Sequence, residues 1–146
     1  TFWCKCFTHA MKSNEYKKYT FSKEDDVCLF SAILNSSLFY YIWEIYSDCW
    51  HITKKELDLI HLDFSLVDSK AKKRIVKLYK QLEEELENSK KYIGSVQTDY
   101  VYQHKLHKTT IDKIDILIGR LFDLNDDEIN EIINYQLAYR LNTERK

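Results

Sequence analysis

Apolar residues recur at helical spacing along most of the chain. Steps of three and four residues place side chains on one face of a helix. The first stripe follows Ser22, which with Asp25 three residues later is typical of a helix start. The pattern therefore predicts one continuous helix over this stripe, which consists of Val27, Phe30, Leu34, Leu38, Tyr41 and Ile45.

A second, longer stripe predicts a helix over residues 69–92, with Gly94 as its terminator. A coiled-coil seam is the alternative, although Glu85 interrupts the heptad pattern. The stripe consists of Ala71, Ile75, Leu78, Leu82 and Leu86.

Polar start signals predict a further short helix. Thr53 and Glu56 have the spacing of a capping box, and Ile52 and Leu57 that of a hydrophobic staple. We expect a helix over residues 54–60, followed by an extended stretch at 62–66.

The C-terminal part predicts a helical hairpin. Thr109 is the expected cap of the first helix, and Asn125 with Glu128 forms a second capping box. The second helix is expected to run to about Arg140. A short loop between two helices is typical of an antiparallel pair.

Strand-like sequence is sparse. Residues 2–7 and 16–21 are rich in aromatics and predict two short strands, and residues 100–102 are expected to be extended. The sequence thus predicts a mainly α (α+β) fold with a small N-terminal β element and a C-terminal helical hairpin. We expect a single domain over residues 1–146, forming the C-terminal piece of a longer chain.

Composition excludes several classes of active site. The chain has no proline, and its two glycines, Gly94 and Gly119, are far apart. Phosphate-binding loops need clustered glycines so that the backbone can approach the ligand. A P-loop, a dinucleotide-binding fingerprint and a Gly-x-Ser-x-Gly elbow are therefore excluded.

Charge is segregated although the net charge is only −1. Residues 70–80 carry six lysines and arginines and no acid, and a run of glutamates follows at 83–87. A solvated helix face with pairs across the junction is one interpretation. A basic stripe that contacts phosphates is the other.

The candidate catalytic and metal-binding groups do not converge. Asp112 and Asp115 are expected near a helix start. The preferred interpretation is a favourable interaction with the helix dipole, and a catalytic dyad is the alternative. His104 and His107 lie in a stretch without helical periodicity. The four cysteines are Cys4, Cys6, Cys28 and Cys49, and they are expected to be reduced thiols. A metal site that also includes His9 and His51 is the weaker alternative.

Two blocks of sequence carry a family resemblance. The first contains Leu34-Asn35-Ser36-Ser37-Leu38-Phe39-Tyr40, Ser47-Asp48 and His51. The second contains Ile111-Asp112-Lys113-Ile114-Asp115, Leu124, Asp127-Glu128, Ile132-Ile133-Asn134-Tyr135 and Tyr139-Arg140. In this order they resemble the region that follows the catalytic domain in adenine-specific DNA methyltransferases of bacterial restriction–modification systems, including enzymes that also cleave DNA.

The resemblance implies a target-recognition module. The family's Asn-Pro-Pro-Tyr/Phe motif cannot occur in a chain without proline, so the catalytic core and its S-adenosylmethionine site are expected elsewhere in the parent protein. This chain is expected to bind no cofactor and no metal. The implied partners are double-stranded DNA and the N-terminal catalytic domain of the same chain, in the cytoplasm and without a membrane.

The candidate DNA contacts divide into two kinds. Lys54 and Lys55 are expected to contact phosphates, and a set of short polar side chains is expected to contact base edges. That set consists of Asn35, Ser36, Ser37, Ser47 and His51. For residues 35–37, a role in helix packing is the alternative to contact with base edges. The alternative for the whole chain is a helical protein–protein interaction module without DNA contact.

Overall fold

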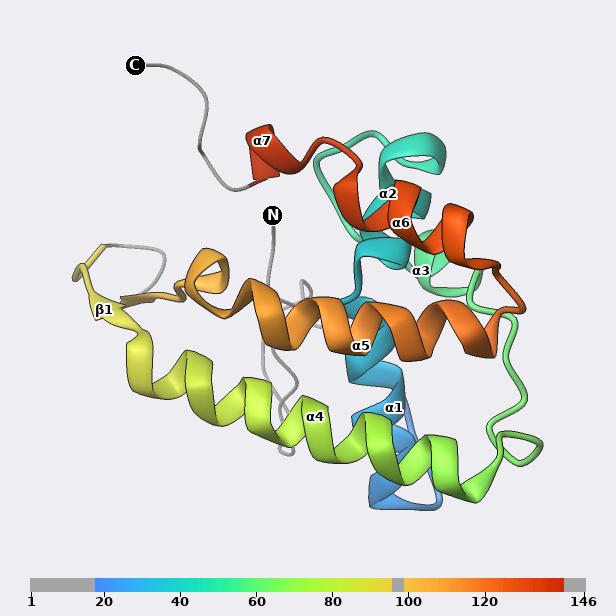
Figure 1. Cartoon of the computed structure of the whole chain (residues 1–146). Helices are drawn as coiled ribbons and strands as arrows, with labels where there is room; N and C mark the ends of the chain where they lie inside the picture. Colours follow the sequence, from blue (N-terminus) through green and yellow to red (C-terminus); the bar gives the residue numbers. More distant parts are fainter. Residues whose placement is uncertain (1–17, 96–98, 141–146) are drawn as a thin grey trace.

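Three helices, α1 (Glu24–Leu34), α4 (Ser69–Ser89) and α5 (Lys108–Leu121), build the centre of the fold. The computed structural model describes residues 18–95 and 99–140. α4 lies against both α1 and α5, and in Figure 1 α4 and α5 run side by side with α1 crossing behind them. Their apolar faces form one core, which includes Leu29, Ile33, Ile75, Tyr79, Leu82, Leu86, Ile114 and Ile118.

The single helix predicted from the first stripe is wrong, because the chain forms two helices there. α1 ends at Leu34, and α2 (Ser37–Tyr46) begins after a bend of 59°. Ser36 is the N-cap of α2, and its hydroxyl accepts a hydrogen bond from the backbone N–H of Phe39 at 3.2 Å. A serine that caps a new helix competes with continuation of the previous one.

Within the described residues, no single helix has both the length and the apolar composition of a membrane span; α1 and α2 reach that criterion only when taken together as a bent pair.

The predicted capping box at Thr53 is confirmed. The backbone N–H of Thr53 donates to Glu56 Oε2 at 2.8 Å, and the Thr53 hydroxyl accepts from the first turn of α3 (Lys54–Leu57). The helix is shorter than the predicted 54–60. Residues 64–66 form a turn instead of the expected extended stretch. Leu57 packs in a second apolar cluster with Phe30, Leu34 and Phe39.

The long amphipathic helix is confirmed as α4, although it ends at Ser89 rather than near Gly94. Asp68 caps it by accepting from the backbone N–H of Ala71 at 2.8 Å. Because its apolar face is buried against α1 and α5, it is no coiled-coil seam. β1 (Lys91–Tyr92) follows, and Gly94 adopts a φ of +57° after this strand.

A small hairpin joins α4 to α5. β2 (Tyr100–Val101) pairs antiparallel with β1, with Lys91 opposite Val101, which confirms the extended stretch expected there. The 3-10 helix η1 (His104–His107) leads into α5. Thr109 is not the cap that the sequence predicted, since α5 begins at Lys108 and its cap position is His107.

The C-terminal hairpin is confirmed as α5 and α6 (Asp126–Asn134). Gly119 permits the close approach, because a Cβ there would lie 2.5 Å from Ile129 Cγ1. The last helix does not continue to Arg140 as predicted. The chain breaks at Gln136, which has a φ of +48°, and resumes as α7 (Leu137–Arg140).

Replacing Asn125 by Ala is expected to lower the free energy of unfolding by about 1 kcal/mol. Its side chain accepts from the backbone N–H of Glu128 at 3.0 Å, and Glu128 accepts from the Asn125 N–H at 2.8 Å. Urea unfolding followed by circular dichroism measures the change. Asn125→Ser, which keeps a capping oxygen, is the matched control, and an equal loss in both variants would contradict the capping role.

The predicted mainly α fold is confirmed, with one two-stranded sheet in the described part of the chain. The strand expected at residues 2–7 and the first two positions of the one at 16–21 lie outside the described residues. Residues 18–21, which are described, contain no strand.

Candidate functional site

The Asn-Ser-Ser triplet that the sequence singled out lies inside the fold. Ser36 and Ser37 are 3% and 0% exposed. The Ser37 backbone N–H donates to Asp115 Oδ1 at 2.7 Å, and its hydroxyl donates to Asp115 Oδ2 at 2.6 Å. Asn35, half-buried, donates to the carbonyl of Ser31 at 2.8 Å. These contacts favour the packing role over contact with base edges.

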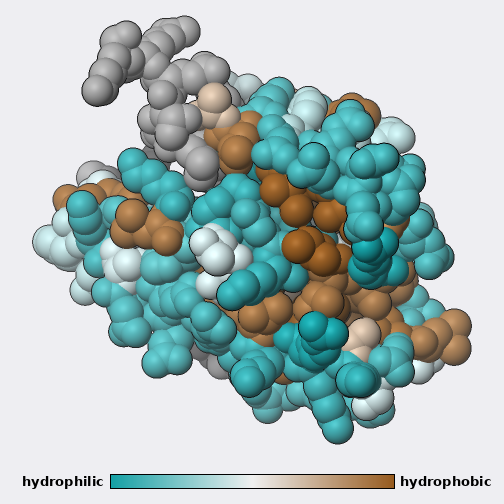
Figure 2. All heavy atoms as spheres, in the orientation of Figure 1, coloured by the Kyte–Doolittle hydropathy of each residue, from teal (hydrophilic) through white to brown (hydrophobic). Residues whose placement is uncertain are grey.

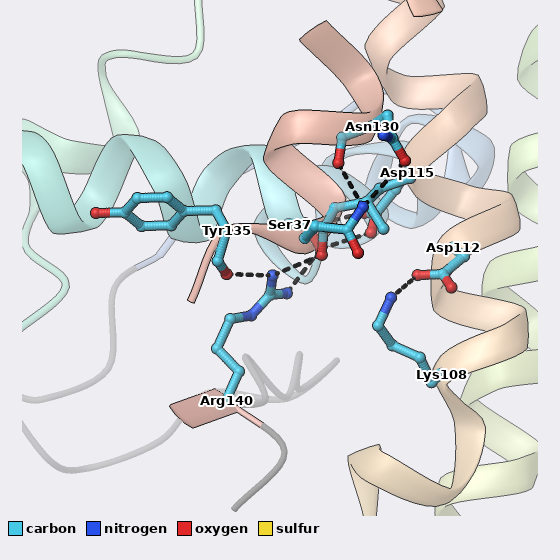
Figure 3. Close-up of polar contacts among 9 residues, drawn as sticks. Ser37, Lys108, Asp112, Asp115, Asn130, Tyr135 and Arg140 are labelled. Carbon is cyan, nitrogen blue, oxygen red and sulfur yellow. Dashed lines mark hydrogen bonds and ion pairs between the residues drawn. The ribbon is translucent and has the colours of Figure 1, made fainter. Parts of the chain in front are cut away.

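Arg140 adds a third member to this buried polar cluster. Its guanidinium donates to the Ser37 hydroxyl at 2.7 Å and lies over the Tyr40 ring, 4.8 Å from the centroid. Figure 3 shows Arg140 reaching from α7 toward Ser37, with the carboxylate of Asp115 on the other side. Residues from α2, α5 and α7 thereby meet at one point, 78 and 103 positions apart in sequence. We refer to Ser37, Asp115 and Arg140 as the buried polar cluster.

Burial shifts both ionisable groups of this cluster toward neutrality. It raises the pKa of Asp115 to about 6, although the hydrogen bonds from Ser37 and the charge of Arg140 oppose the shift. It also lowers the pKa of Arg140, which Asp115 and Tyr40 oppose. The dipole role predicted for Asp115 is therefore wrong. Its partner is a distant serine, and the first turn of α5 contains no acid.

The surroundings of Asp115 do not form a substrate site. Asp112 pairs with Lys108 on the same helix, so the two carboxylates serve different partners. The hollow beside Asp115 has room for about one water molecule. Figure 2 shows apolar side chains gathered on this face, over α5 and α6. The hollow is lined by Leu38, Gly119, Leu124, Ile129, Ile132 and Ile133.

The second candidate site is the exposed segment of residues 47–55, which connects α2 to α3 at the top of Figure 1. Asp48 Oδ1 accepts from the backbone N–H groups of Trp50 at 2.9 Å and His51 at 3.0 Å. Trp43 Nε1, from α2, donates to the His51 carbonyl at 2.9 Å. Cys49 takes a φ of +59° within the turn. We call this stretch the 47–55 segment.

Hydrogen bonds also fix the charge state of Asp48. The backbone N–H of His51 and that of Trp50, followed by the His51 side chain, lower the pKa of Asp48 to about 2. His51 Nδ1 lies 3.1 Å from Asp48 Oδ2. The carboxylate is therefore directed at its own turn. Ser47, which the sequence placed in the site, accepts from the Cys49 N–H at 2.9 Å.

The outer side of the 47–55 segment is aromatic and basic. The side chain of Trp50 is 85% exposed, and Lys54 and Lys55 are exposed at the start of α3. Neither lysine forms an ion pair with any residue in the described ranges. Sequence reasoning missed Trp50. Its position between a polar turn and a capped helix is the signal that could have identified it.

Two basic side chains of the α4 stripe form ion pairs with acidic residues of α1. Lys72 Nζ lies 2.6 Å from Asp26 Oδ1 and donates to the Phe64 carbonyl at 2.6 Å. Lys80 pairs with Glu24 at 3.0 Å, on the surface. The other basic side chains of the stripe remain exposed, and they are Lys70, Lys73, Arg74 and Lys77.

No group of three or more potential metal ligands occurs among residues 18–95 and 99–140. Cys28 is buried, which raises the pKa of its thiol, and Cys49 is exposed as a free thiol. Burial lowers the pKa of His104 to about 4. Cys4, Cys6 and His9 of the alternative metal site lie outside the described residues.

No protein-family model, curated protein or solved structure matches this chain.

Proposed function

We propose that the chain is the DNA-binding, target-recognition module of an adenine-specific DNA methyltransferase from a restriction–modification system. The catalytic core, with its S-adenosylmethionine site, is then an N-terminal part of the same protein. The family named in this proposal rests on the sequence resemblance. The proposed DNA contact rests on the 47–55 segment, whose exposed lysines can bind phosphates.

The observation that carries the proposal is the distribution of charge in and beside the 47–55 segment. Asp48 directs its carboxylate at backbone N–H groups of its own turn, and Glu56 is 4% exposed within the capping box. Lys54 and Lys55 face solvent and lack an ion-pair partner among the described residues. Asp48 and Glu56 are thus occupied while Lys54 and Lys55 are available to phosphate, although Asp58 is exposed at the end of α3 and the net charge of the chain is −1.

The proposed contacts follow from exposure. Lys54 and Lys55 hold phosphates. His51, whose side chain is 68% exposed, and the half-buried Ser47 are the polar groups of the segment that we assign to base edges. Ser36 and Ser37 fix the geometry of α2 from inside, and the half-buried Asn35 holds the end of α1.

A second candidate function, a protein-interaction module, is favoured by one observation. Ile45 and Tyr46 at the end of α2 are 52% and 59% exposed, close in sequence to Trp50. Exposed apolar side chains of this kind are common at protein interfaces. This function predicts a partner protein and no dependence on DNA.

Replacing Lys54 and Lys55 together by Ala is expected to weaken binding to duplex DNA and to reduce its salt dependence. Removing one phosphate-binding lysine lowers the slope of log affinity against log salt by about 0.9, so the double variant should reduce the slope by about 1.8. Fluorescence anisotropy with a mixed-sequence duplex of about 30 base pairs measures both quantities.

Two matched double variants make this test specific. Lys105→Ala with Lys113→Ala removes the same charge from exposed positions on η1 and α5 and should leave the slope unchanged. Lys73→Ala with Lys77→Ala tests the α4 stripe. An unchanged affinity and slope in the Lys54/Lys55 variant, with weaker binding in the α4 variant, would move the DNA contact to α4 and refute the assignment.

A further inference from the structure

Trp50 is held in place by a network that its own side chain does not join. Its backbone N–H donates to Asp48 Oδ1, the following residue is tied to the same carboxylate, and Trp43 bonds the carbonyl of His51. The indole itself is 85% exposed. A large apolar side chain on a fixed turn contributes little to the fold from such a position, and its exposure to water is unfavourable.

The turn removes most of the entropic cost of presenting this ring. The backbone on both sides of Trp50 is hydrogen-bonded, and a tryptophan has only two side-chain torsions to fix on binding. Pre-organisation of this kind raises affinity for whatever the ring contacts. The local structure is therefore that of a contact residue rather than of a core residue.

The lysines that follow Trp50 favour a nucleic acid over a protein as the occupant. Lys54 and Lys55 lie four and five positions further on, exposed and without ion-pair partners in the described structure. Lysine is depleted from protein–protein interfaces, where it would have to be desolvated. An exposed aromatic ring a few positions before exposed lysines fits a base in contact with the ring and phosphates bound by the lysines.

We propose that Trp50 is the base-contacting side chain of the 47–55 segment, inserted at a base step of duplex DNA while Lys54 and Lys55 hold the adjacent phosphates. This inference rests on the proposed DNA-binding function and adds a residue that the sequence resemblance does not supply. Insertion of an apolar wedge partly unstacks a base step and kinks the duplex, which can then contact more of the protein surface. A ring inserted in this way gives affinity without releasing counterions.

The test compares Trp50→Ala with Trp50→Phe in the chain of 146 residues, using a mixed-sequence duplex of about 30 base pairs. Trp50→Ala should weaken binding roughly 5- to 150-fold, as expected when one base no longer stacks on a ring, at an unchanged salt slope. Trp50→Phe should retain most of the affinity because it keeps a ring. Circular dichroism should be the same for both variants, since the side chain packs on little of the fold.

Tryptophan fluorescence gives a second readout. The chain has three tryptophans, and DNA should quench part of the emission of the wild type. That part should disappear in Trp50→Phe, because an indole stacked on a base is quenched. DNA binding that Trp50→Ala leaves at wild-type affinity, or a quench that survives in Trp50→Phe, would overturn this inference and leave the DNA-binding function standing. A chain that does not bind DNA overturns both.

Discussion

The free energy of unfolding is expected to fall by about 3 kcal/mol, through Asp115 alone, as the pH rises from about 3 to about 7. Burial raises the pKa of this carboxyl to about 6 in the folded chain, whereas an unfolded aspartate titrates near about 3.9. Between these two pKa values the native state holds a proton that the unfolded state has released. Stability is then highest below the unfolded pKa and is lost as pH rises through the folded pKa.

The groups that face Asp115 explain why the shift is not larger. Ser37 donates two hydrogen bonds to it from α2, Arg140 contributes positive charge from α7, and Asp112 on α5 opposes them. Desolvation of a carboxylate that is only 4% exposed outweighs these favourable contacts.

Asp115→Asn is the control for this pH dependence. It keeps the shape and an acceptor for the Ser37 N–H, and it removes the titration. Urea unfolding of both proteins at a series of pH values isolates the contribution of Asp115 as their difference, because the other carboxylates titrate in both. A difference that stays constant from about pH 4 to about pH 7 would contradict the burial of this group as a carboxylate with a raised pKa.

Replacing Lys72 by Met is expected to lower the free energy of unfolding by about 2–4 kcal/mol at neutral pH. Methionine keeps most of the aliphatic stem and removes the ammonium. Asp26, 8% exposed, is then without the cation 2.6 Å from its carboxylate, and the Phe64 carbonyl is without its donor. A buried charge without a partner costs far more than the pair contributes when intact.

Lys80→Met provides a matched control on the same helix. Lys80 also pairs with a carboxylate of α1, Glu24, but both side chains are exposed, so its removal should change stability little. The double variant Asp26→Leu with Lys72→Met should recover much of the stability, since two apolar groups then replace the pair. Equal effects of Lys72→Met and Lys80→Met would show that the Asp26–Lys72 pair is not buried in solution.

Local signals predicted the parts of the fold that depend on neighbouring residues. The capping boxes at Thr53 and Asn125 were readable because donor and acceptor lie three positions apart. The long helix α4 could be predicted from the sequence because its apolar stripe is regular. The bend between α1 and α2 was missed because the stripe continues through it, although Ser36, as a cap, was a signal for a new helix start.

The buried polar cluster could not be predicted, for a physical reason. Asp115 pairs with Ser37 across 78 residues, and Arg140 reaches Ser37 across 103. No spacing rule relates positions that far apart. Local sequence places Asp115 near a helix start, where solvation is the usual expectation, and only the packing of α2 against α5 buries it.

The candidate interface was predicted in part. Lys54 and Lys55 were identified from the helix start, and the structure describes both as exposed. Trp50 was not identified from the sequence, since a tryptophan in an aromatic-rich stretch is ordinarily a core residue. The turn at Asp48 holds the backbone of Trp50 by hydrogen bonds, while the ring itself is exposed.

The proposal of DNA binding is tested most directly by the salt dependence of binding to duplex DNA. The 146-residue chain is titrated into a labelled mixed-sequence duplex between about 50 and 200 mM salt, and log affinity is plotted against log salt. If Lys54 and Lys55 contact phosphates, affinity falls linearly with a slope at least as steep as about −1.8. No binding at the lowest salt, or an affinity that does not change with salt, would contradict the proposal.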